Sequence, residues 1–105
     1  MLRIHDVMRD AIGTMRPMLR AIERQDRDLA SQLRRAASSV VLNLAESSGS
    51  VGGVRTQRYR TALGSARETR SCLLVAERFG YIEAMPAPLV AMLNQVIGTL
   101  VRVAV

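Results

Sequence analysis

The stretch from Leu29 to Ser48 constrains the fold of this chain more than any other. Its apolar residues recur at steps of three and four, which places them on one face of an α-helix; they are Leu29, Leu33, Ala36, Ala37, Val40, Val41 and Leu44. The segment 49–53 that follows contains three glycines, which favour turn and left-handed geometry and therefore end the helix. The pattern predicts the central helix of an all-α bundle.

The apolar residues available for a core also favour helices. The chain has 105 residues, enough for one domain, and 49% of them are hydrophobic. Only two tyrosines and one phenylalanine are aromatic, so leucine, valine, isoleucine, methionine and alanine must fill the interior. That composition suits packed helices better than a sheet sandwich. A lone bundle of this size is marginally stable, and self-association is therefore expected.

Three further segments repeat apolar residues at helical spacing. A short polar turn, in which Asp26 or Asp28 can cap the next helix, makes the first two helices antiparallel neighbours. One long helix bent at Pro17 is the alternative. We expect residues 1–105 to form a single domain, an all-α antiparallel up-down-up-down four-helix bundle. The predicted helices cover about residues 5–24, 28–48, 56–79 and 87–103.

The third helix carries its own local signals. Thr56 is a candidate N-cap, and Gly80 is expected to end the helix as its C′ residue. Gly64 and Ser65 in the helix interior predict the close approach of another backbone, because small residues there cost stability relative to alanine.

Several features indicate where the protein resides. Cys72 is the single cysteine, so an internal disulfide cannot form, which fits a reducing cytoplasm. The N-terminal residues lack the apolar run of a secretory signal. Asn94, Gln95 and Arg102 interrupt the apolar C-terminal segment, which falls short of a membrane span. We expect a cytoplasmic protein with no membrane partner.

The sequence indicates no catalytic, cofactor or metal site, and we expect no enzymatic activity. His5 is the only histidine and has no clustered metal ligands around it. A catalytic interpretation would use Glu46 and Glu68 as an acid/base pair. A structural interpretation is favoured, in which buried polar groups satisfy one another and fix helix register. The predicted network comprises Arg35, Asn43, Glu46 and Glu68.

Positive charge is concentrated on the third helix. The net charge is +6, and every basic residue is arginine. A GC-rich genome would explain the absence of lysine, whereas the net charge itself favours an acidic partner. Arginines repeated in this way can neutralise phosphates and bind RNA or DNA with strong salt dependence; a merely solvated helix face is the alternative. The candidate nucleic-acid-binding residues are Arg55, Arg58, Arg60, Arg67, Arg70 and Arg78.

The apolar face of the fourth helix spans about half its circumference, wider than the ~100° that a surface helix needs. The excess predicts burial on two sides, inside the bundle and against another subunit. Leu42 lies off the apolar stripe of its own helix and is either an ordinary exposed leucine or part of the same contact. The candidate interface residues are Leu42, Val90, Ile97 and Val101.

Two strings resemble a known family: LASQLRRAASSVVLNLAESSG and YRTALGSARETRSCLLVAERFGYI. They are similar to the four-helix-bundle family first known from proteins encoded in intervening sequences of large-subunit ribosomal RNA genes. The family's second-helix string is matched by Gln32, Arg35, Ala36, Ser39, Val40, Asn43, Leu44, Ala45 and Glu46. Its third-helix strings are matched by Ala62, Gly64, Ser65, Glu68, Gly80, Tyr81 and Ile82. Ser47 departs from the family's glycine, and the first helix lacks the family's Phe-Pro segment.

The resemblance, over about residues 29–101, implies a bundle that assembles as a ring, usually a pentamer. A distant relative is the accessory protein of diversity-generating retroelements, which binds a reverse transcriptase and nucleic acid. We therefore expect a non-enzymatic homo-oligomeric scaffold or adaptor whose arginine-rich third helix binds RNA, DNA, a reverse transcriptase or another RNA-handling protein. The alternative is a protein-interaction subunit of a multi-component system without nucleic-acid contact.

Overall fold

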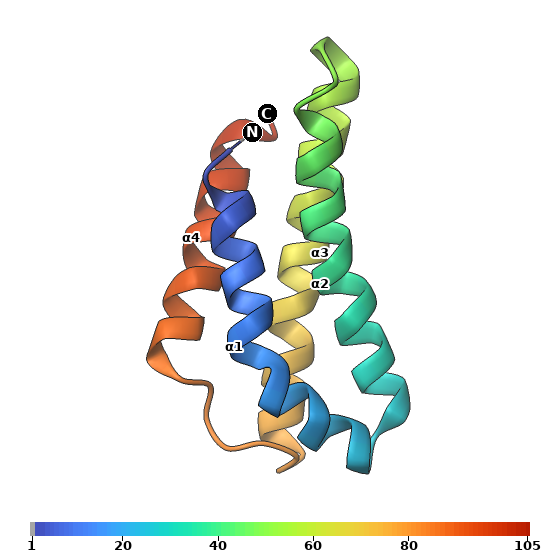
Figure 1. Ribbon diagram of the computed structural model, residues 1–105, viewed down its shortest axis with the longest axis vertical. Coiled ribbons are helices and arrows are strands. Elements are labelled where there is room, and N and C mark those ends of the chain that lie inside the picture. The colour runs from blue at the N-terminus through green and yellow to red at the C-terminus, as the bar shows by residue number, and fades with distance from the viewer. Residues whose placement is uncertain (1) are drawn as a thin grey trace.

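Four α-helices run up and down in chain order in the computed structural model, which describes residues 2–105 (Figure 1). Consecutive helices pack side by side, and α4 returns against α1. The bundle measures 42 × 25 × 19 Å, and the residues that the structure describes contain no β-strand. The predicted all-α up-down-up-down fold is confirmed. The helices are α1 (Ile4–Gln25), α2 (Arg27–Ser47), α3 (Gly52–Arg78) and α4 (Ala87–Val103).

The junction between α1 and α2 is a single residue, Asp26. Its extended backbone, with φ −155° and ψ 91°, breaks the helix. Its side chain accepts a hydrogen bond of 3.0 Å from the N–H of Leu29, which satisfies one free donor of the first turn. The alternative of one long helix is therefore wrong. Pro17 lies within α1, and the C-terminal part of α1 swings toward the start of α2 (Figure 1).

The third helix begins one turn earlier than the sequence predicts. The expected N-cap Thr56 lies inside α3, where its Oγ1 donates to the carbonyl oxygen of Gly52 at 3.4 Å. Gly52 adopts a positive φ of 58°, which glycine tolerates, and Val51 occupies the N-cap position. Glycine is unfavourable in the interior of a helix. It is tolerated in the first turn, where the backbone N–H groups have no intrahelical hydrogen-bond partners. The α2–α3 hairpin consequently projects beyond the ends of α1 and α4 (Figure 1).

The end of α3 follows the prediction. Gly80 has φ 76°, its N–H donates to the carbonyl of Glu77, and the N–H of Tyr81 donates to the carbonyl of Ala76 at 2.9 Å. This is the Schellman arrangement that a C′ glycine permits. Gly64, by contrast, is exposed, and a Cβ placed there would meet nothing within 4 Å. The expected close approach of a backbone at Gly64 is therefore wrong.

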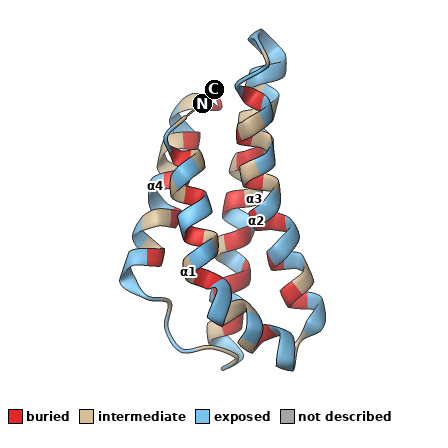
Figure 2. Ribbon diagram, in the orientation of Figure 1, coloured by how far each residue is buried: buried red, intermediate tan, exposed pale blue. Residues whose placement is uncertain are grey.

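The core is aliphatic and lies along the bundle axis, where buried positions of all four helices face one another (Figure 2). The central stripe of α2 contributes as predicted, with Leu33, Val40 and Leu44 fully buried. Most of the wide apolar face of α4 is buried inside the bundle, because α4 packs against both α1 and α3. Its buried residues are Leu89, Leu93, Val96, Ile97 and Leu100.

Candidate functional site

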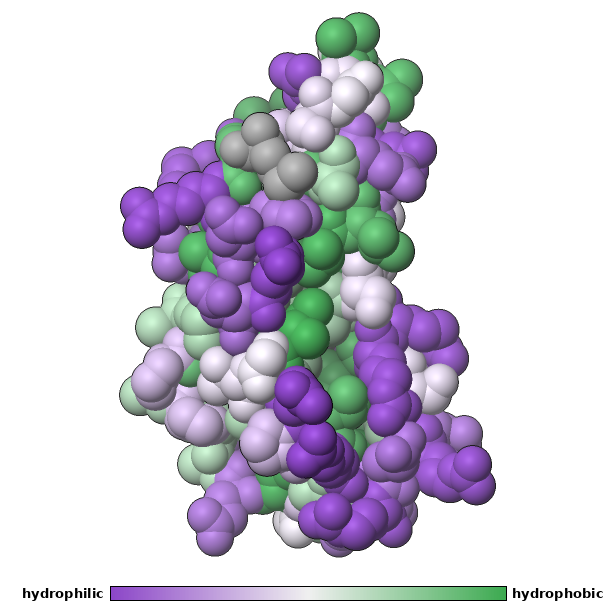
Figure 3. All heavy atoms as spheres, in the orientation of Figure 1, coloured by the Kyte–Doolittle hydropathy of each residue, from purple (hydrophilic) through white to green (hydrophobic). Residues whose placement is uncertain are grey.

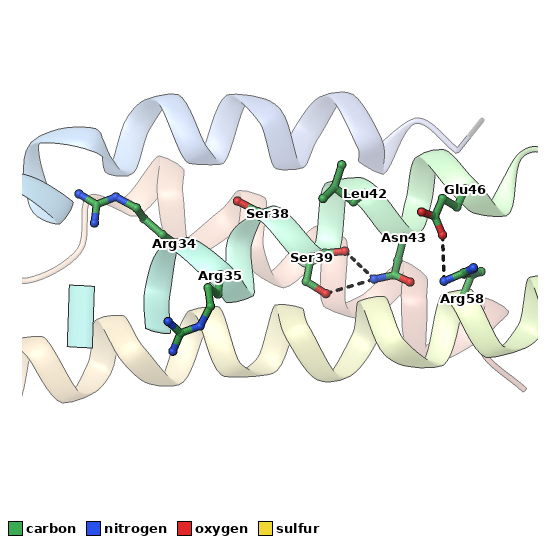
Figure 4. A pocket seen from close by; sticks show the side chains of 8 residues that line it. All are labelled: Arg34, Arg35, Ser38, Ser39, Leu42, Asn43, Glu46 and Arg58. Atoms are coloured by element: carbon green, nitrogen blue, oxygen red, sulfur yellow. Dashed lines mark hydrogen bonds and ion pairs between the residues drawn. The ribbon is translucent and has the colours of Figure 1, made fainter. Parts of the chain in front are cut away.

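A groove of about 450 Å³ lies between α2 and α3. Figure 4 shows that its polar side chains come mainly from successive turns of α2, with Arg58 reaching in from α3. These residues share a face because they are spaced by three or four positions on a helix. The groove's polar side chains include Arg34, Arg35, Ser39, Asn43, Glu46 and Arg58.

Two ion pairs neutralise two of the three arginines in this groove. A guanidinium nitrogen of Arg58 lies 2.8 Å from a carboxylate oxygen of Glu46, which ties α3 to α2. Arg34 donates to the carboxylate of Glu23 on α1, also at 2.8 Å. All four side chains are about half exposed, so each pair contributes no more than about 1 kcal/mol to stability.

Hydrogen bonds hold the middle of the groove in one arrangement. The amide nitrogen of Asn43 donates to the carbonyl oxygen of Ser39 at 2.9 Å and to its hydroxyl at 3.1 Å. The hydroxyl of Ser65 on α3 donates to the same Ser39 oxygen at 2.7 Å. Because both nitrogen bonds face back along α2, the Asn43 carbonyl oxygen remains an acceptor toward the groove (Figure 4).

The structure splits the predicted polar network. Asn43 is half-buried and hydrogen-bonded, but Glu46 is exposed and pairs with Arg58, a member of the predicted nucleic-acid cluster. Glu68 is exposed on the outer side of α3 and makes no ion pair with the residues described. The guanidinium of Arg35 donates to the hydroxyl of Ser31 at 2.6 Å and reaches no carboxylate of residues 2–105. The prediction that Glu46 and Glu68 lie near the core is therefore wrong.

The predicted arginine cluster of α3 divides by contact. Four members contact neighbouring elements. Arg58 pairs with Glu46. Arg55 donates a hydrogen bond to the carbonyl of Ser47, Arg60 donates to the carbonyl of Ala104, and Arg70 donates to the side-chain oxygen of Asn94.

The two remaining arginines are exposed. Arg67 and Arg78 make no hydrogen bond or ion pair within the described part of the chain. With Arg60 they fall along one line of α3, because their spacings of 7 and 11 residues return to nearly the same side of a helix.

Apolar side chains line two shallow hollows on the surface. Near the end of α3, Leu74, Val75 and Phe79 surround Arg78 in a shallow hollow of about 320 Å³, and Phe79 is 67% exposed. We call these three apolar residues the α3 patch. A second hollow follows the seam between α1 and α2, where Ile12, Val41 and Leu42 line it. Hydrophobic atoms reach the surface along this seam (Figure 3). We call these three residues the α1–α2 seam.

The predicted interface residues fall into three environments. Leu42 is 60% exposed and Val101 is 45% exposed, so both are available to another molecule. Val90 is half-buried. Ile97 is only 7% exposed and packs in the core, which leaves it little surface for a neighbouring copy. The α3 patch was missed, although its residues lie opposite the inner stripe of their helix and the sequence alone could have shown it.

Two groups outside the groove have perturbed acidity. Burial, and secondarily the negative charge of Glu68, raises the pKa of the Cys72 thiol. Partial desolvation, then the charge and a hydrogen bond of Asp26, raises the pKa of the Tyr81 phenol. Both shifts favour the neutral form, so the thiolate nucleophile is disfavoured. Among the residues described, no three histidine, cysteine or carboxylate side chains cluster as metal ligands do.

These features define an antiparallel four-helix bundle with an arginine-lined polar groove between its second and third helices and two apolar surface patches. The chain belongs to the 23S rRNA-intervening sequence protein family, whose profile matches residues 7–101. This confirms the family indicated by the strings on the second and third helices. Searches of curated proteins and of solved structures found no match. In the part of the chain described, every helix is too short or too polar to cross a membrane.

Proposed function

We propose that this protein is a non-enzymatic, homo-oligomeric scaffold of the cytoplasm that presents its arginine-bearing third helix to nucleic acid. The observation that carries the scaffold role is the pair of exposed apolar surfaces, the α3 patch and the α1–α2 seam, on a bundle whose core is already complete. Apolar surface of this kind marks sites of protein association.

The two surfaces also favour a particular assembly. They share no residue and lie on different helices, so they can meet each other between successive copies. Contacts between two different patches are heterologous, and they close into a ring when the rotation between copies allows it. The predicted ring, of which a pentamer is one form, is therefore compatible with these surfaces.

Nucleic-acid binding is the finer part of the proposal. Its support is the exposed pair Arg67 and Arg78 in line with Arg60 on the outer side of α3. In an assembly this line repeats once per copy, and each phosphate contact releases counterions. Phe79, beside Arg78, is the one exposed aromatic side chain near this line in the described residues, so binding would be directed mainly at the phosphate backbone rather than at stacked bases.

Sedimentation equilibrium tests the scaffold role. The unmodified protein should sediment as a defined oligomer. Phe79→Asp and Leu42→Asp, placed in the α3 patch and the seam, should each shift it toward monomer, because a buried unpaired carboxylate is costly. Val105→Asp is the matched control, since Val105 is 89% exposed and lies outside both surfaces. A monomeric unmodified protein would overturn the assembly.

Retention of labelled single-stranded RNA at several salt concentrations tests the arginine line. Replacing Arg67 and Arg78 together by glutamine should weaken binding and reduce the slope of log affinity against log salt by about 1.4 per engaged subunit, at ~0.7 per lost phosphate contact. The control replaces Arg16 and Arg20, two exposed arginines of α1, and should leave the slope unchanged. An equal change in both pairs would contradict the assigned line.

A second candidate function is supported by the surroundings of Arg78. The side chain lies in the apolar hollow of the α3 patch, an arrangement typical of protein interfaces, in which arginine and aromatic residues are enriched. This favours a protein-interaction subunit, whose partner could be a reverse transcriptase or another RNA-handling protein. Absence of salt-dependent RNA retention together with an intact oligomer would select this alternative.

A further inference from the structure

We infer that the groove between α2 and α3 binds a mononucleotide, with its phosphate at Arg35 and the amino-bearing edge of its base at Asn43 and Glu46. Leu42, which is 60% exposed at the edge of the groove, supplies an apolar surface for the base. The groove is distinct from the arginine line of the proposed function, because neither Arg67 nor Arg78 lines it; Leu42 is shared with the α1–α2 seam, so the groove and the seam meet at this residue.

The phosphate end is assigned from the balance of charge. Of the three arginines in the groove, Arg34 pairs with Glu23 and Arg58 pairs with Glu46, each at 2.8 Å. Arg35 is the one without a carboxylate partner in residues 2–105, and its single hydrogen bond, to Ser31, leaves most of its donors uncommitted. A guanidinium with free donors binds phosphate in bidentate fashion. The hydroxyl of Ser38 lines the same groove and can add a donor.

The base end is assigned from acceptors. The amide nitrogen of Asn43 is fixed by its two bonds to Ser39, so its carbonyl oxygen faces the groove as an acceptor. The carboxylate of Glu46 lies one turn further along α2, and its pairing with Arg58 leaves lone pairs for a second donor. Neighbouring acceptors of this kind suit an exocyclic amino group of a base and repel a second phosphate.

The spacing and volume fit one nucleotide. Arg35 and Asn43 are eight residues apart on one helix, which corresponds to about 12 Å along its axis. The groove volume of about 450 Å³ lies within the range of small-molecule sites. The carboxylate of Glu46 disfavours a phosphate at the base end of the groove, which fixes the orientation of the nucleotide.

Isothermal titration calorimetry of the full chain with adenosine monophosphate tests the inference, together with amide spectra that report the Asn43 side chain. We expect saturable binding at one site per chain and a shifted Asn43 side-chain resonance. Arg35→Gln should weaken binding 10- to 100-fold, as loss of a charged hydrogen-bonding partner does, which is about 1.4–2.8 kcal/mol at about 1.4 kcal/mol per tenfold. Adenosine, which lacks the phosphate, and inosine monophosphate, which lacks the amino group, should also bind more weakly.

Arg67→Gln is the matched control, an exposed arginine of the neighbouring helix outside the groove, and should bind adenosine monophosphate as the unmodified protein does. Circular dichroism of each variant establishes that the bundle is folded. Absence of binding, equal losses in Arg35→Gln and Arg67→Gln, or equal affinity for adenosine would overturn the inference. RNA retention that persists in Arg35→Gln and falls in the Arg67 and Arg78 variant would leave the proposed function standing whichever result the groove gives.

Discussion

The hydroxyl oxygens of Ser39 on α2 and Ser65 on α3 lie 2.7 Å apart, in a part of the interface that is only half-buried. The same Ser39 oxygen receives a bond from Asn43, so one side chain joins two helices and orients the polar middle of the groove. All three residues belong to the strings that indicated the family. Their contact shows why serine occupies these places, where alanine would otherwise suit a helix better.

Ser65→Ala should lower the free energy of unfolding by about 0.5–1.5 kcal/mol, the usual net contribution of one hydrogen bond. Ser71→Ala, at an exposed position of the same helix, is the control and should change stability little. Urea denaturation of both variants measures the difference. A loss in Ser65→Ala no larger than in the control would mean that the Ser39–Ser65 bond does not stabilise the bundle.

Leu44→Ala should destabilise the protein by about 2–5 kcal/mol, because the side chain is fully buried in the core and its removal leaves a cavity. Leu42→Ala removes the same atoms from a position two residues away that is 60% exposed, and it should cost far less. Thermal or urea unfolding of the pair at one protein concentration compares them. A loss below about 1 kcal/mol at Leu44 would contradict its central place in the bundle.

Gly64→Ala should stabilise the protein by about 0.5–1 kcal/mol, because this exposed helix position has open space for a methyl group and alanine is the better helix former. Gly80→Ala should do the opposite. Space exists there too, but the backbone φ of 76° is one that alanine adopts only with strain. Unfolding midpoints of the two variants should therefore move in opposite directions.

The Cys72 thiol should react slowly with iodoacetamide at mildly alkaline pH, because burial raises its pKa and the thiolate is the reacting species. Glu68→Gln removes the secondary cause of the shift and should lower the pKa and speed the reaction. A rate profile against pH checks both statements, with Glu83→Gln, an exposed carboxylate of the α3–α4 connection, as the control.

The same shift predicts how stability depends on pH. The folded state disfavours the thiolate, so the pKa of Cys72 is higher folded than unfolded. The neutral Cys72 thiol therefore contributes fully to the free energy of unfolding below the ordinary thiol pKa. This contribution declines as pH rises toward the pKa of the thiol in the folded state. Cys72→Ala should flatten this part of the stability profile, whereas an unchanged profile would contradict the assignment.

Helix periodicity was sufficient to predict the four helices and the burial of Leu44, because a core stripe is a local property of the sequence. The start of α3 was not predictable in the same way. Glycine propensity argued for a loop as far as Thr56, whereas Gly52 with its positive φ opens the helix directly. Propensity describes each residue alone, and the long pairing of α3 along α2 overrode it.

Side-chain partners were harder to predict than helices. Arg58 and Glu46 are twelve residues apart, and nothing local indicates that the short hairpin brings them to 2.8 Å. The sequence showed that the apolar face of α4 is wide, but it did not show what covers that face. Two neighbouring helices, α1 and α3, bury Ile97 and leave Val101 45% exposed. Choices among partners depend on crossing geometry, which a one-dimensional pattern does not contain.

The projecting end of the α2–α3 hairpin has a practical consequence. Its outermost turn lies beyond the ends of α1 and α4 (Figure 1), and Val51 is 77% exposed. An epitope, a fluorophore or a short peptide spliced between Gly49 and Gly53 would stand clear of the groove and of both apolar surfaces. A label in the hairpin would therefore allow the number of copies in an assembly to be counted without altering the groove or the two apolar surfaces.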